Sequence, residues 1–251
     1  IYTDELRLLA WGTDAGFYRL IPKIVIRAKD ENEVSRLLAL ADKYTLPVTF
    51  RAAGTSLSGQ SISDSILIVA GKNWEKYSIS EDFERITLQP GIIGARVNEI
   101  LKPHGRKFAP DPASVKSAMV GGIDGTRLNT GDPESRMTFE KNHTPFLNKI
   151  IEIRDEIRND NELSDRIRKK YSIKNVTGLN LLPFVIYDDP FDIIAHLMVG
   201  SEGTLAFLSE VTMKTEHDYP YSASAMLYFS NIKDACRAVV AMKPGPVFSA
   251  E

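Results

Sequence analysis

The sequence has 251 residues, 43% hydrophobic and 25% charged, which are the proportions of a globular protein able to bury a core. Its net charge of −2 gives no electrostatic reason to expect nucleic acid as a partner. No apolar run approaches the roughly 20 residues that span a bilayer, and the charged Asp4, Glu5 and Arg7 do not suggest a signal peptide. Cys236 is the single cysteine, which excludes an internal disulfide and a cysteine-ligated metal site in this sequence. These features favour a cytoplasmic protein, either free or peripheral at the inner membrane.

Residues 21–70 show the alternation of apolar strands with a helix that is typical of a parallel α/β unit. Residues 24–26 and 47–50 are predicted strands, and Asp30 is a candidate cap for a helix between them. Residues 66–70 are a third predicted strand. Parallel strands end at one edge of a sheet, where ligands bind. The loop after the second strand is therefore predicted to lie at a ligand-binding edge.

That loop is rich in small residues and hydroxyls. Residues 51–60 read Arg-Ala-Ala-Gly-Thr-Ser-Leu-Ser-Gly-Gln. Such a loop can turn consecutive backbone N–H groups toward a phosphate. Gly54 and Gly59 would remove the Cβ atoms that keep a pyrophosphate at a distance, so filling that space in Gly54→Val should abolish cofactor retention. Taken alone, the loop is equally compatible with an ordinary surface turn, because glycine and serine are common turn residues.

The remaining chain is predicted to mix hairpin strands with helices. Residues 74–91 suggest a hairpin, and a helix over 96–101 follows. Residues 145–171 carry apolar residues at helical spacing and are predicted to be helical throughout. Residues 210–214 are a predicted strand, and residues 222–243 suggest a strand followed by a helix.

Three further segments would let a ligand approach the backbone closely. Residues 109–114 (Ala-Pro-Asp-Pro-Ala-Ser) form a rigid turn with two prolines around an aspartate. Residues 119–123 and 200–205 carry a Gly-Gly pair and a Gly-Ser-Glu-Gly-Thr-Leu run. Each segment is a weak signal alone, whereas their order along the chain is specific.

The order of these segments resembles the FAD-binding domain of the vanillyl-alcohol oxidase/para-cresol methylhydroxylase superfamily. Within it, the chain is similar to the D-lactate dehydrogenase and glycolate oxidase branch of 2-hydroxyacid dehydrogenases. The N-terminal residues 13–19 and residues 171–178 further resemble large bacterial enzymes in which this domain precedes a cysteine-rich iron–sulfur domain. The resemblance covers nearly the whole chain. The segments that carry it are Pro47–Thr49, Gly54–Gly59, Pro90–Gly91, Pro110–Pro112, Gly121–Gly122 and Gly200–Leu205.

The resemblance implies an α+β fold of the FAD-binding type 4 (PCMH-like) kind. The FAD-binding domain would span residues 1–220. It would comprise a small parallel α/β subdomain over about 21–72 and a larger, mostly antiparallel sheet with helices over about 73–220. Residues 221–251 would begin an α/β substrate or cap domain that this sequence does not complete. We also expect that a loop of the family's domain is missing between Ile123 and Asp124, where the Gly-Gly segment meets an Asp-Gly turn directly.

The resemblance also implies which residues approach FAD. Some relatives attach the flavin through a histidine in the first glycine loop, where this chain has Thr55, so FAD should be held non-covalently. Residues 53–60 would cradle the pyrophosphate, and the remaining positions would contact the flavin, ribityl, ribose or adenine parts. The implied FAD-binding residues are Ala53, Gly54, Thr55, Ser56, Leu57, Ser58, Gly59, Gln60, Pro110, Asp111, Ser114, Gly121, Gly122, Gly200, Gly203, Thr204 and Val211.

By this resemblance the protein oxidises a small 2-hydroxy acid such as D-lactate by hydride transfer to the flavin, which supplies the chemistry. Electrons would pass to an iron–sulfur domain or a quinone, and any iron–sulfur cluster would lie in a region after this sequence. The catalytic base is unassigned. Lys174 and Asn175 are the local candidates near the flavin ring, and a solvated loop is the alternative reading of both.

Two other function classes are open to the sequence. The chain could be a flavin-binding electron-transfer module that does not turn over a hydroxy acid by itself. A nicotinamide-binding Rossmann domain fits less well. Residues 54–59 are not Gly-x-Gly-x-x-Gly, and no acidic residue follows at the distance that binds a ribose.

Overall fold

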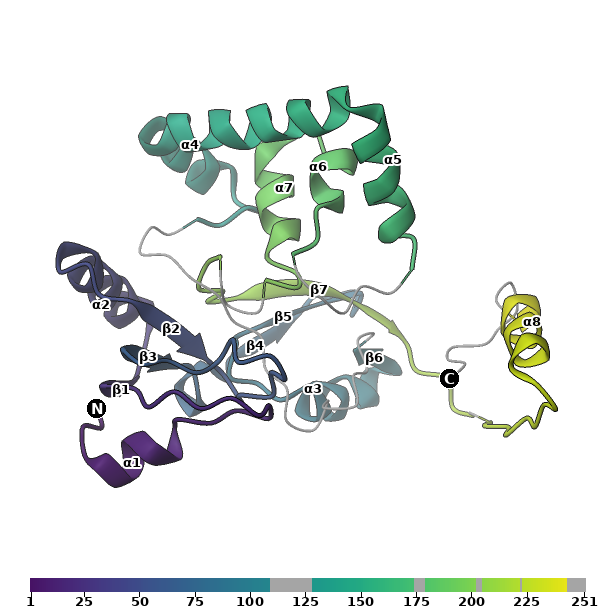
Figure 1. The fold of residues 1–251 in the computed structure, drawn as a ribbon, viewed down its shortest axis with the longest axis horizontal. Coiled ribbons are helices and arrows are strands. Elements are labelled where there is room, and N and C mark those ends of the chain that lie inside the picture. Colours follow the sequence, from purple (N-terminus) through teal and green to yellow (C-terminus); the bar gives the residue numbers. More distant parts are fainter. Residues whose placement is uncertain (109–127, 174–178, 202–204, 222, 243–251) are drawn as a thin grey trace. The chain divides into compact units, whose positions relative to one another are not determined.

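The computed structural model describes residues 1–108, 128–173, 179–201, 205–221 and 223–242. The chain divides into two compact units, Ile1–His217 and Asp218–Glu251. The first unit contains a parallel sheet, an antiparallel sheet and a block of helices (Figure 1). This is the predicted α+β architecture. No helix in the described part of the chain is long and apolar enough to cross a membrane.

The parallel sheet has three strands in the order β1-β3-β2, so the last strand in sequence lies in the middle. Asp30 caps the intervening helix as predicted, because its side chain accepts a hydrogen bond from the Glu33 amide at 2.9 Å. The predicted strands and helix are therefore confirmed. Their bounds are β1 Ile24–Arg27, α2 Glu31–Lys43, β2 Val48–Arg51 and β3 Ile66–Val69.

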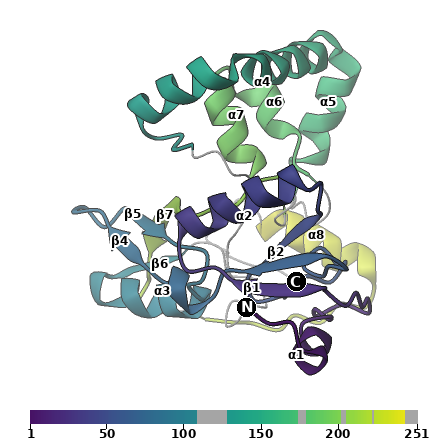
Figure 2. The same ribbon diagram turned by 90° about the vertical axis from the view of Figure 1, so that its left-hand side faces the viewer.

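Apolar side chains cover both faces of this sheet. Phe50 and Ile68 pack with Val34 of α2 on one face, and Leu67 packs with Trp11 on the other. Figure 2 shows α2 and the short helix α1 (Glu5–Ala10) on opposite sides of the strands. The residues before β1 thus form the second cover of the sheet.

The connection from β2 to β3 contains no helix. Neighbouring parallel strands need a crossover of a dozen or more residues, and a helix usually provides it. Here residues 52–65, which include the glycine-rich loop, make the crossover without forming a helix. The loop therefore runs from the carboxyl end of one strand back to the start of its neighbour.

The second sheet is antiparallel, with strand order β4-β5-β7-β6. The predicted hairpin and the strand after the third glycine-rich segment are both present. Helix α3 (Gly94–Leu101) packs against one face, with Val97 and Leu101 buried. The strand bounds are β4 Tyr77–Ile79, β5 Arg85–Leu88, β6 Arg106–Phe108 and β7 Val211–His217, and two 3-10 turns cover Lys72–Trp74 and Lys102–His104.

Gly91 allows the chain segment after the first sheet to contact the segment after β5. A Cβ atom on Gly91 would lie 2.2 Å from the Gly71 carbonyl oxygen and 2.7 Å from that of Trp74. The Gly91 amide also donates a hydrogen bond to the Trp74 carbonyl at 2.7 Å. The Pro90–Gly91 pair therefore has a packing role between the two sheets.

The residues between β6 and β7 form a separate block of helices (Figure 1). The continuous helix predicted for 145–171 is instead two helices, because Asp160 caps a new helix through the Leu163 amide at 2.9 Å. The first of them begins earlier than predicted and kinks at His143, ahead of Pro145, which has no N–H for the helical ladder. The helices are α4 Pro133–Asn159, α5 Asn161–Lys170, α6 Leu182–Ile186 and α7 Pro190–Leu197.

Two arginines of α4 connect it to the start of α7. Arg136 forms ion pairs with Asp189 at 2.7 Å and Asp192 at 3.3 Å. Arg158 pairs with Asp188 and donates to the Tyr187 carbonyl at 2.7 Å. This arginine holds the pKa of Asp188 below its ordinary value, first by hydrogen bonding and then by charge. These ion pairs and the hydrogen bond join α4 to residues 187–192, where α7 begins.

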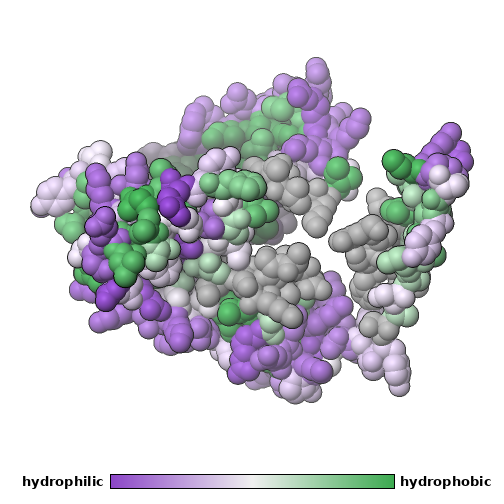
Figure 3. All heavy atoms as spheres, turned by 60° about the horizontal axis from the view of Figure 1, so that its bottom comes forward, coloured by the Kyte–Doolittle hydropathy of each residue, from purple (hydrophilic) through white to green (hydrophobic). Residues whose placement is uncertain are grey.

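The second unit, Asp218–Glu251, contains the predicted helix as α8 (Ile232–Met242). Residues 223–229 form no strand, because an isolated strand without a hydrogen-bonded neighbour is not stable. Apolar side chains of this unit are exposed, including Met226, Ile232 and Val240 at 78%, 83% and 70%. The space-filling view colours such side chains green (Figure 3).

The cap at Asp160 predicts a measurable stability loss. Asp160→Ala removes the acceptor for the Leu163 amide, so the free energy of unfolding should fall by about 1 kcal/mol. Urea denaturation followed by circular dichroism measures this change. Asp165→Ala, on the exposed surface of the same helix, is the control and should change stability by less than about 0.5 kcal/mol. Equal losses in both variants would contradict the capping role.

Candidate cofactor-binding site

The glycine-rich loop has the backbone geometry of an anion cradle. It leaves the carboxyl end of β2, and Gly54 and Gly59 adopt positive φ values of 72° and 82°. Among the described residues, no acceptor pairs with the backbone N–H groups of Gly54, Thr55, Leu57 and Gly59. Unpaired amides in a loop with left-handed turns form the concave nests that bind phosphate. The residues present therefore fit a pyrophosphate-bearing cofactor.

Gly54 also lies against the side chain of Arg51. A Cβ atom there would lie 2.3 Å from Nη2 of Arg51, with Cζ and Nε at 2.5 and 2.6 Å. The side chain of Gly54→Val would thus meet the guanidinium of Arg51, in addition to the predicted clash with the pyrophosphate. The left-handed backbone adds a second cost to any larger residue.

Residues 15–18 of the N-terminal segment pack against the glycine-rich loop. The Ala15 amide donates to the Gly54 carbonyl at 3.1 Å. A Cβ atom on Gly16 would lie 2.7 Å from the Leu57 carbonyl oxygen, and one on Gly59 would lie 3.3 Å from the Tyr18 ring. The N-terminal backbone therefore contacts the loop backbone at Gly54 and Leu57, and the Tyr18 ring lies against Gly59. The sequence signal for this contact is the pair of glycines at positions 16 and 54.

A hydrogen bond between two side chains lies within the loop. The Ser56 hydroxyl donates a hydrogen bond to the Gln60 side-chain oxygen. Leu57 and Ser58 are exposed, whereas Ser61 and Ser63 beyond the loop are buried. The buried serines hold the returning chain, and the exposed tip stays open to a ligand.

The third glycine-rich segment is tied to the first loop by an aromatic cluster. Gly200 has a φ of 86°, and Ser201 behind it is buried. The Phe207 ring packs 5.0 Å from Phe50 and 4.9 Å from Trp74, measured between ring centroids. Phe50 directly precedes Arg51 in β2. The chain after residues 202–204 is thus anchored through Phe207 to the strand that carries the first loop.

Of the remaining predicted positions, Val211 lies within the described residues. Val211 begins β7, where it pairs with Leu88 of β5 and packs against the core of the antiparallel sheet. The other residues, and the predicted missing loop after Ile123, lie outside the described residues. These are Pro110, Asp111, Ser114, Gly121, Gly122, Lys174, Asn175, Gly203 and Thr204.

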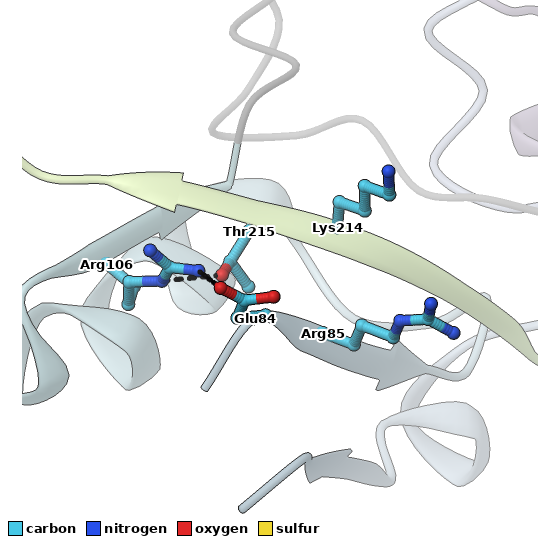
Figure 4. Close-up of a pocket in the computed structure, with 5 residues that line it drawn as sticks. All are labelled: Glu84, Arg85, Arg106, Lys214 and Thr215. Carbon is cyan, nitrogen blue, oxygen red and sulfur yellow. Dashed lines mark hydrogen bonds and ion pairs between the residues drawn. The ribbon is translucent and has the colours of Figure 1, made fainter. Parts of the chain in front are cut away.

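A basic hollow of about 250 Å³ lies on the antiparallel sheet, away from the predicted positions. Figure 4 shows its five lining side chains, with Arg106 turned toward Glu84 and Thr215. The Arg106 Nε atom donates to Thr215 Oγ1 at 3.0 Å, and its Nη2 atom lies 3.9 Å from the Glu84 carboxylate. Arg85 and Lys214 face each other across β5 and β7. Arg106 thus has a structural role, joining the hairpin turn to β7.

The glycine-rich loop thus lies at the edge of a small parallel sheet, in a unit that also has an antiparallel sheet and helices. Residues 22–131 match the family model described as an FAD binding domain. Residues 22–131 are therefore similar to an FAD-binding domain, and FAD is the cofactor.

Curated relatives extend the similarity over most of the chain. Glycolate oxidase subunit GlcD of Escherichia coli is 27% identical over 95% of this chain and 44% of that protein. D-2-hydroxyglutarate dehydrogenase of Haemophilus influenzae is 25% identical over 84% and 24%. The mitochondrial cytochrome D-lactate dehydrogenase of Arabidopsis thaliana is 25% identical over 88% and 35%. The chain thus spans less than half the length of each of these relatives.

A solved structure shows the same fold at low identity. Alkyldihydroxyacetonephosphate synthase aligns over 86% of this chain and 37% of its own, with a TM-score of 0.50 and 16% identity. At that identity the likeness concerns the fold alone. It agrees with the mixed parallel and antiparallel sheets described above.

The geometry at Gly54 predicts separate effects on stability and on FAD binding. Gly54→Ala combines a left-handed alanine with displacement of Arg51, so the FAD dissociation constant should rise roughly tenfold or more. Gly105→Ala is the matched control, because Gly105 has a φ of 63° but no atom within 4 Å of its Cβ position. That variant should lose roughly 1–2 kcal/mol of stability and keep its FAD affinity. Flavin fluorescence titration measures the affinities, and equal affinities in both variants would contradict the steric role of Gly54.

Proposed function

We propose that this chain is the FAD-binding part of a dehydrogenase that oxidises a 2-hydroxy acid. The observation that carries the proposal is the common chemistry in the names of its relatives. Glycolate, D-lactate and D-2-hydroxyglutarate each carry a hydroxyl group on the carbon next to a carboxylate. The alignments cover 84–95% of this chain, so the likeness is not confined to the cofactor loop. D-lactate is the substrate we propose first.

The described residues support the cofactor half of this function. Bound FAD would supply the redox chemistry by accepting a hydride from the substrate carbon. Residues 53–60 would hold the pyrophosphate through backbone amides such as those of Gly54 and Thr55, which pair with no acceptor in the described part of the chain. We propose that Gly200 and Val211, together with the predicted positions outside the described residues, contact the rest of the cofactor.

The other half of the proposed function is recognition of the substrate. A carboxylate substrate calls for an arginine or lysine that can pair with it. We propose Lys174 and Asn175 as the candidates near the flavin ring. Electrons would pass to an iron–sulfur domain or a quinone. We propose a cytoplasmic location, where the exposed thiol of Cys236 would stay reduced.

A second candidate function is an FAD-binding electron-transfer module without substrate turnover of its own. The observation that favours it is that the chain spans 44% or less of the relatives described above. In that case the chain would bind FAD, and the hydroxy acid would be recognised elsewhere in the intact protein.

Anaerobic reduction of the bound flavin distinguishes these two functions. Adding D-lactate, glycolate or D-2-hydroxyglutarate to the FAD-loaded chain should bleach the visible flavin band with at least one of them. L-lactate and propionate are the controls, since the first inverts the reacting carbon and the second lacks the hydroxyl. A band that survives every 2-hydroxy acid but is bleached by dithionite would favour the electron-transfer module.

The mode of FAD attachment is tested by acid precipitation. Because Thr55 stands where some members of the superfamily carry a histidine link, all flavin should be released into the supernatant. Absorbance of the supernatant and of the redissolved pellet measures the partition. Yellow colour retained in the pellet would show a covalent bond and overturn the prediction.

A further inference from the structure

Arg51 ends β2 and lies beneath the glycine-rich loop. Side chains alternate along a strand, so Phe50 packs on the α2 face and Arg51 emerges on the opposite face. In the register of the sheet, Arg51 of β2 and Arg27 of β1 both pair with Val69 of β3. The two arginines thus end the two strands that flank β3, at the same edge of the sheet, but Arg27 is exposed whereas Arg51 is half-buried.

The guanidinium of Arg51 is held from two sides. Its Nη1 atom donates to the carbonyls of Thr13 at 2.6 Å and Trp11 at 3.3 Å, and Cζ lies 5.2 Å from the centre of the Trp11 ring. On the other side it fills the space where a Cβ atom of Gly54 would stand. The Gly54 carbonyl in turn accepts the Ala15 amide at 3.1 Å. One side chain therefore connects the loop to the N-terminal segment.

The positive charge of Arg51 is partly desolvated and not fully balanced. Burial lowers the pKa of Arg51 from its ordinary value, and the nearby Asp14 carboxylate opposes that change. Within the described residues, no carboxylate forms an ion pair with Arg51, and its Nε atom is buried without a hydrogen-bond partner. Asp14 instead accepts hydrogen bonds from the Gly16 amide at 2.7 Å and the Ser61 hydroxyl at 3.4 Å. A guanidinium stays protonated, so this charge favours an anion bound by the loop.

We propose that Arg51 is a positioning residue for FAD. It fixes the loop in the conformation whose amides receive the pyrophosphate, and it adds a positive charge behind them. The N-terminal segment 11–16 takes part through the two carbonyls that hold the guanidinium. FAD binding should therefore order residues 11–16, although they lie outside the loop itself. Because this role rests on the proposed pyrophosphate cradle, its test must separate the two.

The test compares three arginine variants of the whole chain. Arg51→Met removes the charge and both hydrogen bonds but keeps the length of the side chain, and should raise the FAD dissociation constant roughly tenfold or more. Arg51→Lys keeps the charge but lacks the planar fork, so its affinity should be intermediate. Arg27→Met is the matched control, with the same charge change at the same sheet edge, and should alter FAD affinity by less than about twofold.

Hydrogen exchange distinguishes a role in positioning FAD from a purely structural role. A purely structural role would not change which amides FAD protects. In the unsubstituted chain, adding FAD should slow exchange of the amides in residues 11–16 as well as 54–59. In Arg51→Met, saturating FAD should still protect residues 54–59 but no longer protect 11–16. Unfolding of each FAD-free variant in urea shows whether the fold is kept. If Arg51→Met does not fold, the same measurements on Arg51→Lys decide the question.

The outcomes separate the positioning role from the cofactor site. Wild-type FAD affinity in Arg51→Met, or an equal loss in Arg27→Met, would overturn the role of Arg51 and leave the cradle in place. FAD protection of residues 11–16 that persists without the arginine would also overturn it. Failure of the unsubstituted chain to protect residues 54–59 would overturn the cradle, and the role of Arg51 with it.

Discussion

Two parallel strands lie side by side in this domain without a helix between them, and the proposed cofactor site lies in the loop that connects them. The chain from β2 to β3 must return across the sheet edge, and residues 52–65 do so as an irregular loop. A loop without a helix has no helix N-terminus to attract phosphate, so in the proposed site the loop's own backbone amides would do so. Such amides also need support from another segment, which the residues before β1 supply.

Packing of three aromatic rings extends this support to the rest of the first unit. Phe50 in β2, Trp74 after the first sheet and Phe207 before β7 form one cluster. Gly91 allows the backbone after β5 to approach that of Trp74. The two sheets and the chain around the third glycine-rich segment are therefore connected by contacts whose partners are far apart in sequence. Replacing any of these three rings would alter the packing around Phe50, which directly precedes Arg51 and the glycine-rich loop.

Local signals predicted most elements, and the errors have physical causes. Asp30 and the apolar strands around it were sufficient for the parallel sheet, because caps and short apolar runs act locally. The helical pattern over 145–171 was correct in period but missed the break at Asp160, since apolar spacing continues across a cap. The strand predicted after residue 221 is not formed, because strand formation depends on a partner that periodicity does not show.

The sequence by itself indicated the cofactor class, because the order of its glycine-rich and proline-rich segments along the chain resembles that of an FAD-binding domain. It also determined the spacing of Gly54 and Gly59, whose positive φ values the structure shows. Only the tertiary structure showed that Arg51 occupies the space where a Cβ atom of Gly54 would stand. The structure also placed residues 11–16 beneath the loop. Contacts between residues about forty positions apart leave no periodic trace in a sequence, so the fold alone brings them together.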